Sequence, residues 1–219
     1  MRSWMNCDSL ATDFFLIAYD EIRDCPALDP YRLTCGLVGA QLAELVIAGL
    51  LTVREDRCVL DTGKRPGNLS RGATLTLDNI TREPRRHPVR AWVDTLGPSV
   101  TELVCEELVC CNVLTVIHRR SLLGRRQACL AVADPSAVRK PGIILRTMLR
   151  QPATFTLEGA ILLLLLTTLG AEQLLEPEVD RNAVRSISAQ AGEHLAGPLV
   201  QLRAGLSEAS AAISLAVRR

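Results

Sequence analysis

The feature that most constrains the fold of this chain is an apolar run at residues 155–171, which contains six consecutive aliphatic residues. Glu158 interrupts the run, and the uncharged remainder is shorter than the roughly 18 to 20 residues that a membrane-spanning helix needs. The run therefore predicts a helix that is buried in a core and around which the rest of the chain packs.

The composition supports one folded domain. The chain has 219 residues, of which 48% are hydrophobic, so it can bury a large core and is not a disordered segment. No low-complexity tail and no linker divides it. We expect a single domain over residues 1–219, with its core at about residues 8–215.

Apolar residues recur at helical spacing along most of the chain and predict a mainly α fold. Helices are expected at residues 9–18, in a long amphipathic segment that ends at Gly49, at 73–81, after Pro88, and at 98–111, 143–151, 156–169 and 179–217. Gly197 and Pro198 are expected to bend or divide the last helix. Two short β-hairpins are expected, at Leu51–Arg54 with Arg57–Leu60 and at residues 113–118 with 127–132. The predicted architecture is a helix bundle surrounded by amphipathic helices, with these two hairpins.

Motifs of known catalytic sites are absent from the sequence. It has no G-x-S-x-G elbow, no H-E-x-x-H pair, no Walker loop and no G-x-G-x-x-G turn. The three histidines, His87, His118 and His194, are scattered. Glu106 and Glu107 are adjacent on one predicted helix, so they face different directions and do not form an acid/base pair. We expect no enzymatic activity, no metal and no other cofactor; an enzyme with another kind of site remains an open alternative.

The cysteine pattern indicates neither a disulfide framework nor a metal site. The chain has eight cysteines but no C-x-x-C pair. Its first eight residues lack the basic and apolar regions of a secretory signal. We therefore expect a cytoplasmic protein in which most cysteines are small buried side chains.

The charge pattern argues against nucleic acid as a partner. The 25 basic residues balance 24 acidic ones, so no overall field attracts a polyanion. Each predicted hairpin follows a helix, as in winged-helix DNA-binding domains. The helix before the second hairpin, however, carries Glu102, Glu106 and Glu107 and no basic residue. DNA would repel such a helix, and we expect no nucleic-acid binding.

The second predicted hairpin carries the clearest candidate site. Its turn combines cations with an exposed leucine pair, which is typical of proteins that rest on an anionic membrane surface. A solvated turn or a contact between copies of the chain accounts for the same residues, and an exposed leucine pair needs a partner. The lipid-binding candidates are Arg119, Arg120, Arg125 and Arg126 in the hairpin, with Arg85 and Arg86 before residue 88. The candidates for membrane or oligomer contact are Leu122 and Leu123.

Six segments, spread over nearly the whole chain, carry a family resemblance. They are LATDFFLIAYDE after Ser9, CGLVGAQLAELVIAGLLTV from Cys35, RCVLD from Arg57, WVDTLG from Trp92, EELVCCNVLTV from Glu106 and LEGAILLLLLTTLGAEQLLEP from Leu157. In this order and spacing they resemble the Golgi phosphoprotein 3-like family, in the form that its actinobacterial members take. The resemblance rests on the whole set of segments, since none of them is a catalytic signature.

The resemblance implies a mainly helical single domain with a protruding hairpin. Eukaryotic members are non-enzymatic, bind phosphatidylinositol 4-phosphate on the cytosolic face of Golgi membranes and act as adaptors that retain glycosyltransferases. Their hairpin is associated with self-assembly and membrane contact. None of the residues at the places of their headgroup-binding tryptophan and three arginines offers a cationic fork to a phosphate. These residues are Asp29, Val38, Pro98 and Thr101.

The sequence supports two functional hypotheses. The first is a cytoplasmic, non-enzymatic adaptor, peripherally associated with anionic or phosphoinositide membranes, whose lipid binding is weak or rebuilt at the arginine-rich hairpin. The second is a scaffold for protein clients that forms a homo-oligomer through this hairpin and binds no lipid. Because the basic N-terminal extension of eukaryotic members is missing, we expect a bacterial relative that functions without a Golgi.

Overall fold

The structure is a computed structural model that describes residues 8–61, 63–83, 85–120, 126–151, 154–175, 181–193, 195 and 197–216. The helices are α1 (Leu10–Ile17), α2 (Pro30–Ile47), α3 (Arg71–Arg82), α4 (Val89–Cys110), α5 (Pro135–Arg150), α6 (Leu157–Thr168), α7 (Arg181–Glu193) and α8 (Gly197–Ala216), with a 3-10 turn, η2 (Glu172–Leu174). The strands are β1 (Tyr19–Asp20), β2 (Cys25–Pro26), β3 (Leu51–Arg54), β4 (Arg57–Leu60), β5 (Leu114–Arg120) and β6 (Arg126–Val132). The fold is mainly α, as the sequence predicts.

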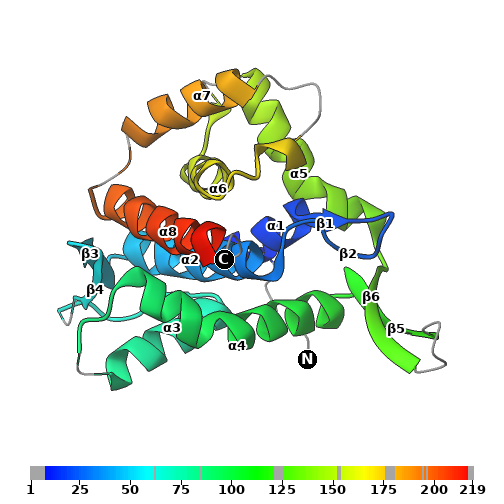
Figure 1. The fold of residues 1–219 in the computed structure, drawn as a ribbon, viewed down its shortest axis with the longest axis horizontal. Helices are drawn as coiled ribbons and strands as arrows, with labels where there is room; N and C mark the ends of the chain where they lie inside the picture. Colours follow the sequence, from blue (N-terminus) through cyan, green and yellow to red (C-terminus); the bar gives the residue numbers. More distant parts are fainter. Residues whose placement is uncertain are drawn as a thin grey trace.

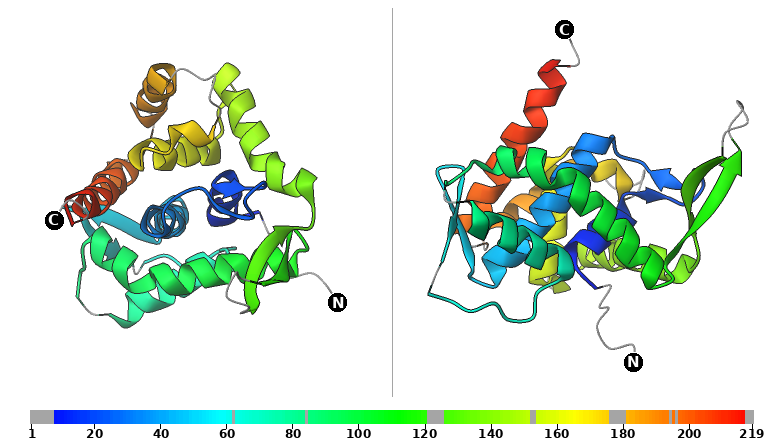
Figure 2. Two further views of the ribbon diagram at one scale, coloured as in Figure 1. Left: turned by 45° about the vertical axis from the view of Figure 1, so that its right-hand side comes forward. Right: turned by 90° about the horizontal axis from the view of Figure 1, so that it is seen from below.

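Helix α2 lies at the centre of the molecule, and α1, α4, α6 and α8 pack around it (Figure 1, Figure 2). Its nine consecutive residues 35–43 are all buried. These residues make more than two turns, so every side of the helix faces protein. The prediction of an amphipathic helix is therefore wrong for α2. Even its polar residue Gln41 is buried, and it accepts a hydrogen bond from the hydroxyl of Thr76 in α3.

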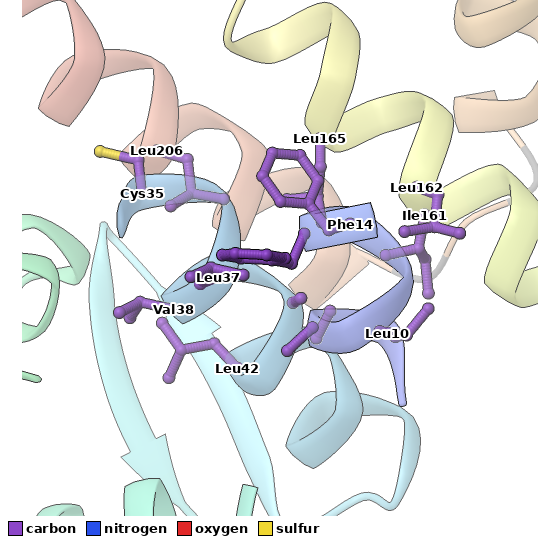
Figure 3. Packing of buried hydrophobic residues seen from close by; sticks show 14 of the residues in the cluster. Leu10, Phe14, Cys35, Leu37, Val38, Leu42, Ile161, Leu162, Leu165 and Leu206 are labelled. Atoms are coloured by element: carbon purple, nitrogen blue, oxygen red, sulfur yellow. The ribbon is translucent and has the colours of Figure 1, made fainter. Parts of the chain in front are cut away.

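The apolar run forms the second core helix, α6, as predicted. Thr156 caps this helix, and residues 159–166 are all buried. Leu165 of α6 and Leu206 of α8 approach α2 at Gly39, where the absence of a side chain permits close packing (Figure 3). No helix in the described ranges is long and apolar enough to span a membrane.

The ends of α1 and α2 follow local capping signals. Ser9 begins α1 with a capping box, because its hydroxyl accepts a hydrogen bond from the Thr12 N–H while the Thr12 hydroxyl accepts one from the Ser9 N–H. Gly49 ends α2 in the left-handed conformation, with φ 70°. The N–H groups of Gly49 and Leu50 then donate to carbonyls of the last turn. Both boundaries agree with the sequence prediction.

Two prolines lie inside helices of the structure, α4 and α5, whose bounds differ from the sequence prediction. The sequence predicts one helix after Pro88 and a further helix at residues 98–111, with Pro98 as the first residue of the second helix. In the structure α4 continues through Pro98, which is exposed, so the carbonyl that loses its partner lies on the solvent side. Helix α5 starts earlier than predicted, since Asp134 caps it and Pro135 occupies its first turn. Pro141 lies inside α5 and is buried.

Three hairpins occur in the described part of the chain, one more than the sequence predicts. The additional hairpin, β1–β2, has two residues in each strand, too few to show an alternating pattern. The predicted hairpin β3–β4 forms, with Glu55 and Asp56 both at positive φ, as a tight two-residue turn requires. The predicted hairpin β5–β6 also forms, with longer strands than expected.

Candidate functional site

The hairpin β5–β6 projects from the body of the protein beyond one end of α4 (Figure 2). Its base is fixed to the core, because Leu114 is buried and the Tyr19 hydroxyl donates a hydrogen bond of 3.0 Å to the Leu130 carbonyl oxygen. Further along β5, Val116 is 49% exposed and His118 is exposed. The described part of the hairpin is therefore braced at its base and open to solvent toward its tip.

The predicted lipid-binding arginines of the hairpin belong to its distal end. In the strand register Arg119 pairs with Gln127, and Arg120 pairs with Arg126. Outside the described residues lie Leu122, Leu123 and Arg125, together with the side chains of Arg119, Arg120 and Arg126. Whether these side chains converge on one surface stays a prediction.

The other two predicted arginines, Arg85 and Arg86, are on the linker between α3 and α4. Helix α4 has 22 residues and separates this linker from β5 (Figure 1). Its length is about 33 Å, at a rise of about 1.5 Å per residue. The exposed residues of α4 include the acids Asp94, Glu102 and Glu106. The structure therefore does not join Arg85 and Arg86 with the hairpin into one continuous basic surface.

Arg85 and Arg86 border a cavity of about 250 Å³ between β4, the end of α3 and the linker, which we call the arginine pocket. Its lining residues are Cys58, Val59, Leu60, Ile80, Thr81, Glu83, Arg85 and Arg86. Glu83 is the one acid in this lining; its carboxylate accepts a hydrogen bond from the Arg85 N–H at 3.3 Å and lies 3.5 Å from Nε2 of His87. Within the described ranges, neither guanidinium of Arg85 or Arg86 forms an ion pair.

One backbone hydrogen bond and one side-chain hydrogen bond hold the linker against β4. The Cys58 N–H donates to the His87 carbonyl at 3.1 Å. Arg57, at the start of β4, donates from Nη1 to the Arg86 carbonyl oxygen at 3.4 Å. Sequence reasoning missed Arg57, because this contact joins residues that are 29 positions apart. The linker is thus fixed along the edge of a sheet and does not hang free in solvent.

A second concave surface, which we call the acidic groove, lies between α3 and α4 and has a volume of about 340 Å³. Its lining residues are Arg71, Thr74, Leu75, Asp78, Ser99, Glu102, Leu103 and Glu106. Arg71 is 3.6 Å from Glu106, whereas Asp78 and Glu102 form no ion pair in the described part of the chain. Sequence reasoning used the acids of α4 only as an argument against DNA binding and missed the groove, which exists because α3 packs beside α4.

A comparison with protein families decides the class of this chain. A family model described as Golgi phosphoprotein 3 (GPP34) matches residues 10–204, from the first residue of α1 into α8. The chain belongs to the Golgi phosphoprotein 3 family. The match contains the hairpin β5–β6, the arginine pocket and the acidic groove. The Golgi phosphoprotein 3 family is not known as enzymatic. No curated protein matches the chain significantly.

We predict from the sequence that the family's headgroup-binding positions fall on Asp29, Val38, Pro98 and Thr101, and this correspondence stays a prediction. Asp29 caps α2 and forms an ion pair of 3.4 Å with Arg32. Val38 is fully buried in the core. Pro98 is exposed on α4, and the Thr101 hydroxyl donates to a carbonyl of its own helix. None of these four side chains is a cation.

The described residues contain no group of three or more His, Cys, Asp and Glu side chains that could hold a metal. Cys35 and Cys58 are buried, and burial raises the pKa of both thiols to about 12, so both stay protonated at neutral pH. Cys25 and Cys110 are exposed, and Cys111 is disulfide-bonded. Cys105, Cys111 and Cys129 are only partly buried. The prediction that most cysteines are buried is therefore wrong for the described ones.

Proposed function

We propose that this member of the Golgi phosphoprotein 3 family is a non-enzymatic adaptor that associates peripherally with anionic membrane surfaces through the hairpin β5–β6. The observation that carries the proposal is the braced and projecting hairpin, whose strands run from the buried Leu114 to Arg120 and return from Arg126. A rigid base lets a short apolar and cationic tip reach a surface without unfolding the body. Membership of the family supports the same assignment.

Electrostatics sets the expected strength of this attachment. Each basic residue near an anionic membrane surface contributes about 1 kcal/mol. The four hairpin arginines together therefore give a useful affinity that salt weakens, because mobile ions screen the attraction. Leu122 and Leu123 add apolar contact with the lipid boundary. The replaced family headgroup positions give no reason to expect specificity for one lipid at that place.

An adaptor also needs a surface for its client, and the acidic groove supports this role. The partly exposed Leu75 supplies apolar contact area, while Asp78 and Glu102 supply negative charge that no ion pair compensates in the described residues. A client segment that carries lysine or arginine next to an apolar side chain complements this lining. The groove and the hairpin belong to different parts of the molecule, so client and membrane can be bound together.

Vesicle co-sedimentation tests the membrane proposal. The protein is mixed with neutral vesicles, with phosphatidylglycerol vesicles and with phosphatidylinositol 4-phosphate vesicles, each at low and high salt. We expect salt-sensitive binding to both anionic vesicles. The test variant replaces with serine the four residues Arg119, Arg120, Arg125 and Arg126. The charge-matched control replaces with serine the exposed residues Arg23, Arg65, Arg90 and Arg203.

Loss of binding in the hairpin variant, with retention in the control, supports attachment through the hairpin. Equal loss in both variants would show that only net charge matters. Undiminished sedimentation of the hairpin variant, or no binding of the unmodified protein to any vesicle, would rule out the membrane proposal.

The second candidate function is an oligomeric scaffold without lipid binding. The observation that favours it is the isolated ribbon β5–β6, in which β5 pairs with no described strand other than β6. An unpaired strand edge with an exposed Val116 can pair with another copy of the chain. Light scattering on a Leu122→Asp, Leu123→Asp variant tests this function. Conversion of an oligomer to a monomer would favour the scaffold, and an unchanged oligomer would exclude the hairpin as the interface.

A further inference from the structure

We infer that the arginine pocket binds a phosphate group, carried as a phosphomonoester on a small ligand or on a lipid. The length of α4 separates this site from the hairpin, and none of Asp29, Val38, Pro98 and Thr101 is in its lining. The inference does not rest on the proposed membrane attachment. The cations in its lining are Arg85 and Arg86. Arg57 on β4 is not part of the lining; it donates a hydrogen bond to the Arg86 carbonyl oxygen.

The guanidinium groups at the pocket are available for a ligand. Arg85 and Arg86 form no ion pair within the described ranges, although arginines elsewhere do, such as Arg139 with Glu21 at 2.7 Å. A guanidinium presents several N–H donors in one plane, which matches two oxygens of a phosphate. Two adjacent unpaired guanidiniums beside a cavity thus supply the charge that a phosphomonoester needs.

The backbone of β4 directs N–H groups toward the outer edge of the hairpin, on the side of the linker. The Asp61 N–H donates across the hairpin to Leu50, whereas the Cys58 N–H donates outward to His87. Alternate residues of an antiparallel strand point their N–H groups to opposite edges. The N–H of Leu60 therefore points, like that of Cys58, to the outer edge, where Leu60 lines the pocket.

The remaining lining of the pocket suits a small anion better than a cation. Glu83 is the single acid, and its carboxylate is directed at the Arg85 N–H and at His87 rather than left without partners. The volume of about 250 Å³ accommodates a phosphate with a small organic group and is too small for a folded partner. Hydrogen bonds to the carbonyl groups of His87 and Arg86 fix the backbone of the linker. Arg85 and Arg86 therefore lose less conformational freedom when a ligand binds.

Isothermal titration calorimetry on the full chain tests the site, with inorganic phosphate and glycerol 3-phosphate as probes. The test variant is Arg85→Gln, Arg86→Gln. The matched control is Arg23→Gln, Arg203→Gln, which removes the same charge from exposed positions. We expect saturable binding by the unmodified protein and the control, and binding weaker by about tenfold or more in the test variant. Both pairs of arginines are exposed, so thermal unfolding should show that both variants fold.

A vesicle experiment distinguishes the two sources of the phosphate. Phosphatidic acid vesicles, which display a phosphomonoester, are compared with phosphatidylglycerol vesicles of equal charge. Binding of the soluble probes assigns a small-ligand site, while a preference for phosphatidic acid that the Arg85 and Arg86 substitutions abolish assigns a lipid headgroup site. No saturable binding of either soluble probe or phosphatidic acid, or equal loss in test and control variants, would overturn the inference.

The hairpin variant with four serines separates this inference from the proposed function. If it loses vesicle attachment and still binds glycerol 3-phosphate, the pocket stands on its own. If the substitutions in the pocket remove phosphate binding while vesicle attachment persists, the pocket and the hairpin are again shown to be separate sites. Loss of phosphate binding in the hairpin variant would contradict a separate pocket.

Discussion

The hydroxyl of Tyr19 donates a hydrogen bond of 3.0 Å to the carbonyl oxygen of Leu130, a residue 111 positions away. This contact ties the segment after α1 to strand β6. It is a side-chain bond that links the base of the hairpin β5–β6 to the N-terminal part of the core. A second side-chain contact, from Arg139 of α5 to Glu21, holds the turn that follows β1.

Replacement of Tyr19 by phenylalanine should destabilise the protein by about 1 kcal/mol, because one partly buried hydrogen bond is lost. Hydrogen exchange should accelerate in β5 and β6 more than in α2 or α6. The control is Tyr31→Phe, whose hydroxyl donates to Asp94 at an exposed position; it should cost less. Uniform acceleration over all helices would show that Tyr19 does not brace the hairpin locally.

Replacement of Gly36 by alanine should destabilise the protein by about 1 to 3 kcal/mol. A Cβ at Gly36 would overlap the ring of Phe14, which is fully buried. The control is Gly142→Ala in α5, where the nearest atom to a new Cβ is 3.8 Å away; it should be neutral or stabilising by up to about 1 kcal/mol. Chemical denaturation measures both, and a stable Gly36→Ala variant would contradict the packing of α1 on α2.

Asp13 should make stability fall as pH rises. Burial raises the pKa of its carboxyl from 3.8 to about 6, with a further increase from Asp8 and a decrease from Lys140. The folded protein holds this proton more tightly than the unfolded chain. The stability that protonated Asp13 contributes is therefore fully present below about pH 4 and is lost as pH rises through about 6. Relative to Asp13→Asn, the free energy of unfolding should drop by about 1 to 3 kcal/mol between pH 4 and 7. Parallel pH profiles of the two proteins would refute this expectation.

Removal of the Arg185 side chain should weaken the attachment of α7. Its Nε donates to Oε1 of Glu172 at 2.7 Å, and the side chain of Glu172 is only 3% exposed. Arg185→Ala leaves this carboxylate without its cation, at an expected cost of about 1 to 3 kcal/mol. Because the two residues form one pair, the double variant with Glu172→Gln should cost less than the sum of the single ones. Additive costs in a double-mutant cycle would count against the pair.

The acidic groove should bind a short peptide that combines leucine with lysine and arginine, and should reject the same peptide with glutamates. Asp78→Asn with Glu102→Gln should weaken this binding, because it removes the charge that faces the groove. Glu55→Gln with Glu158→Gln, two exposed acids elsewhere, is the control. Fluorescence anisotropy measures the affinity, and equal weakening in both variants would reduce the effect to net charge.

Local signals explain the parts of the fold that were predicted. The sequence predicts helix ends at Ser9 and Gly49, because a cap needs only its own side chain or backbone conformation and the adjacent turn. The sequence predicts the turn at Glu55 and Asp56 for the same reason. Signals of this kind lose accuracy where packing overrides them, as at Pro98, which the sequence treats as a boundary and α4 accommodates on its exposed side.

The candidate site shows a similar division. The arginines of the hairpin and of the linker were recognisable as residues, since clustered cations are visible in a sequence. Their grouping was not, because it depends on α4, which holds Arg85 and Arg86 about 33 Å from β5. Two other features also require elements that are distant in sequence to pack together. They are the contact of Arg57 with the linker and the placement of Asp78 and Glu102 in one groove.

The sequence by itself determined the family, the mainly helical class, the caps and the hairpins β3–β4 and β5–β6, because these depend on residue order and on interactions within a few positions. Only the tertiary structure decided that α2 is buried on every side, that the base of β5–β6 is bonded to Tyr19, and that two unpaired arginines border a cavity. The physical reason is that burial and the convergence of charges are properties of surfaces brought together by packing, and periodicity along one segment does not specify which other segment will cover it.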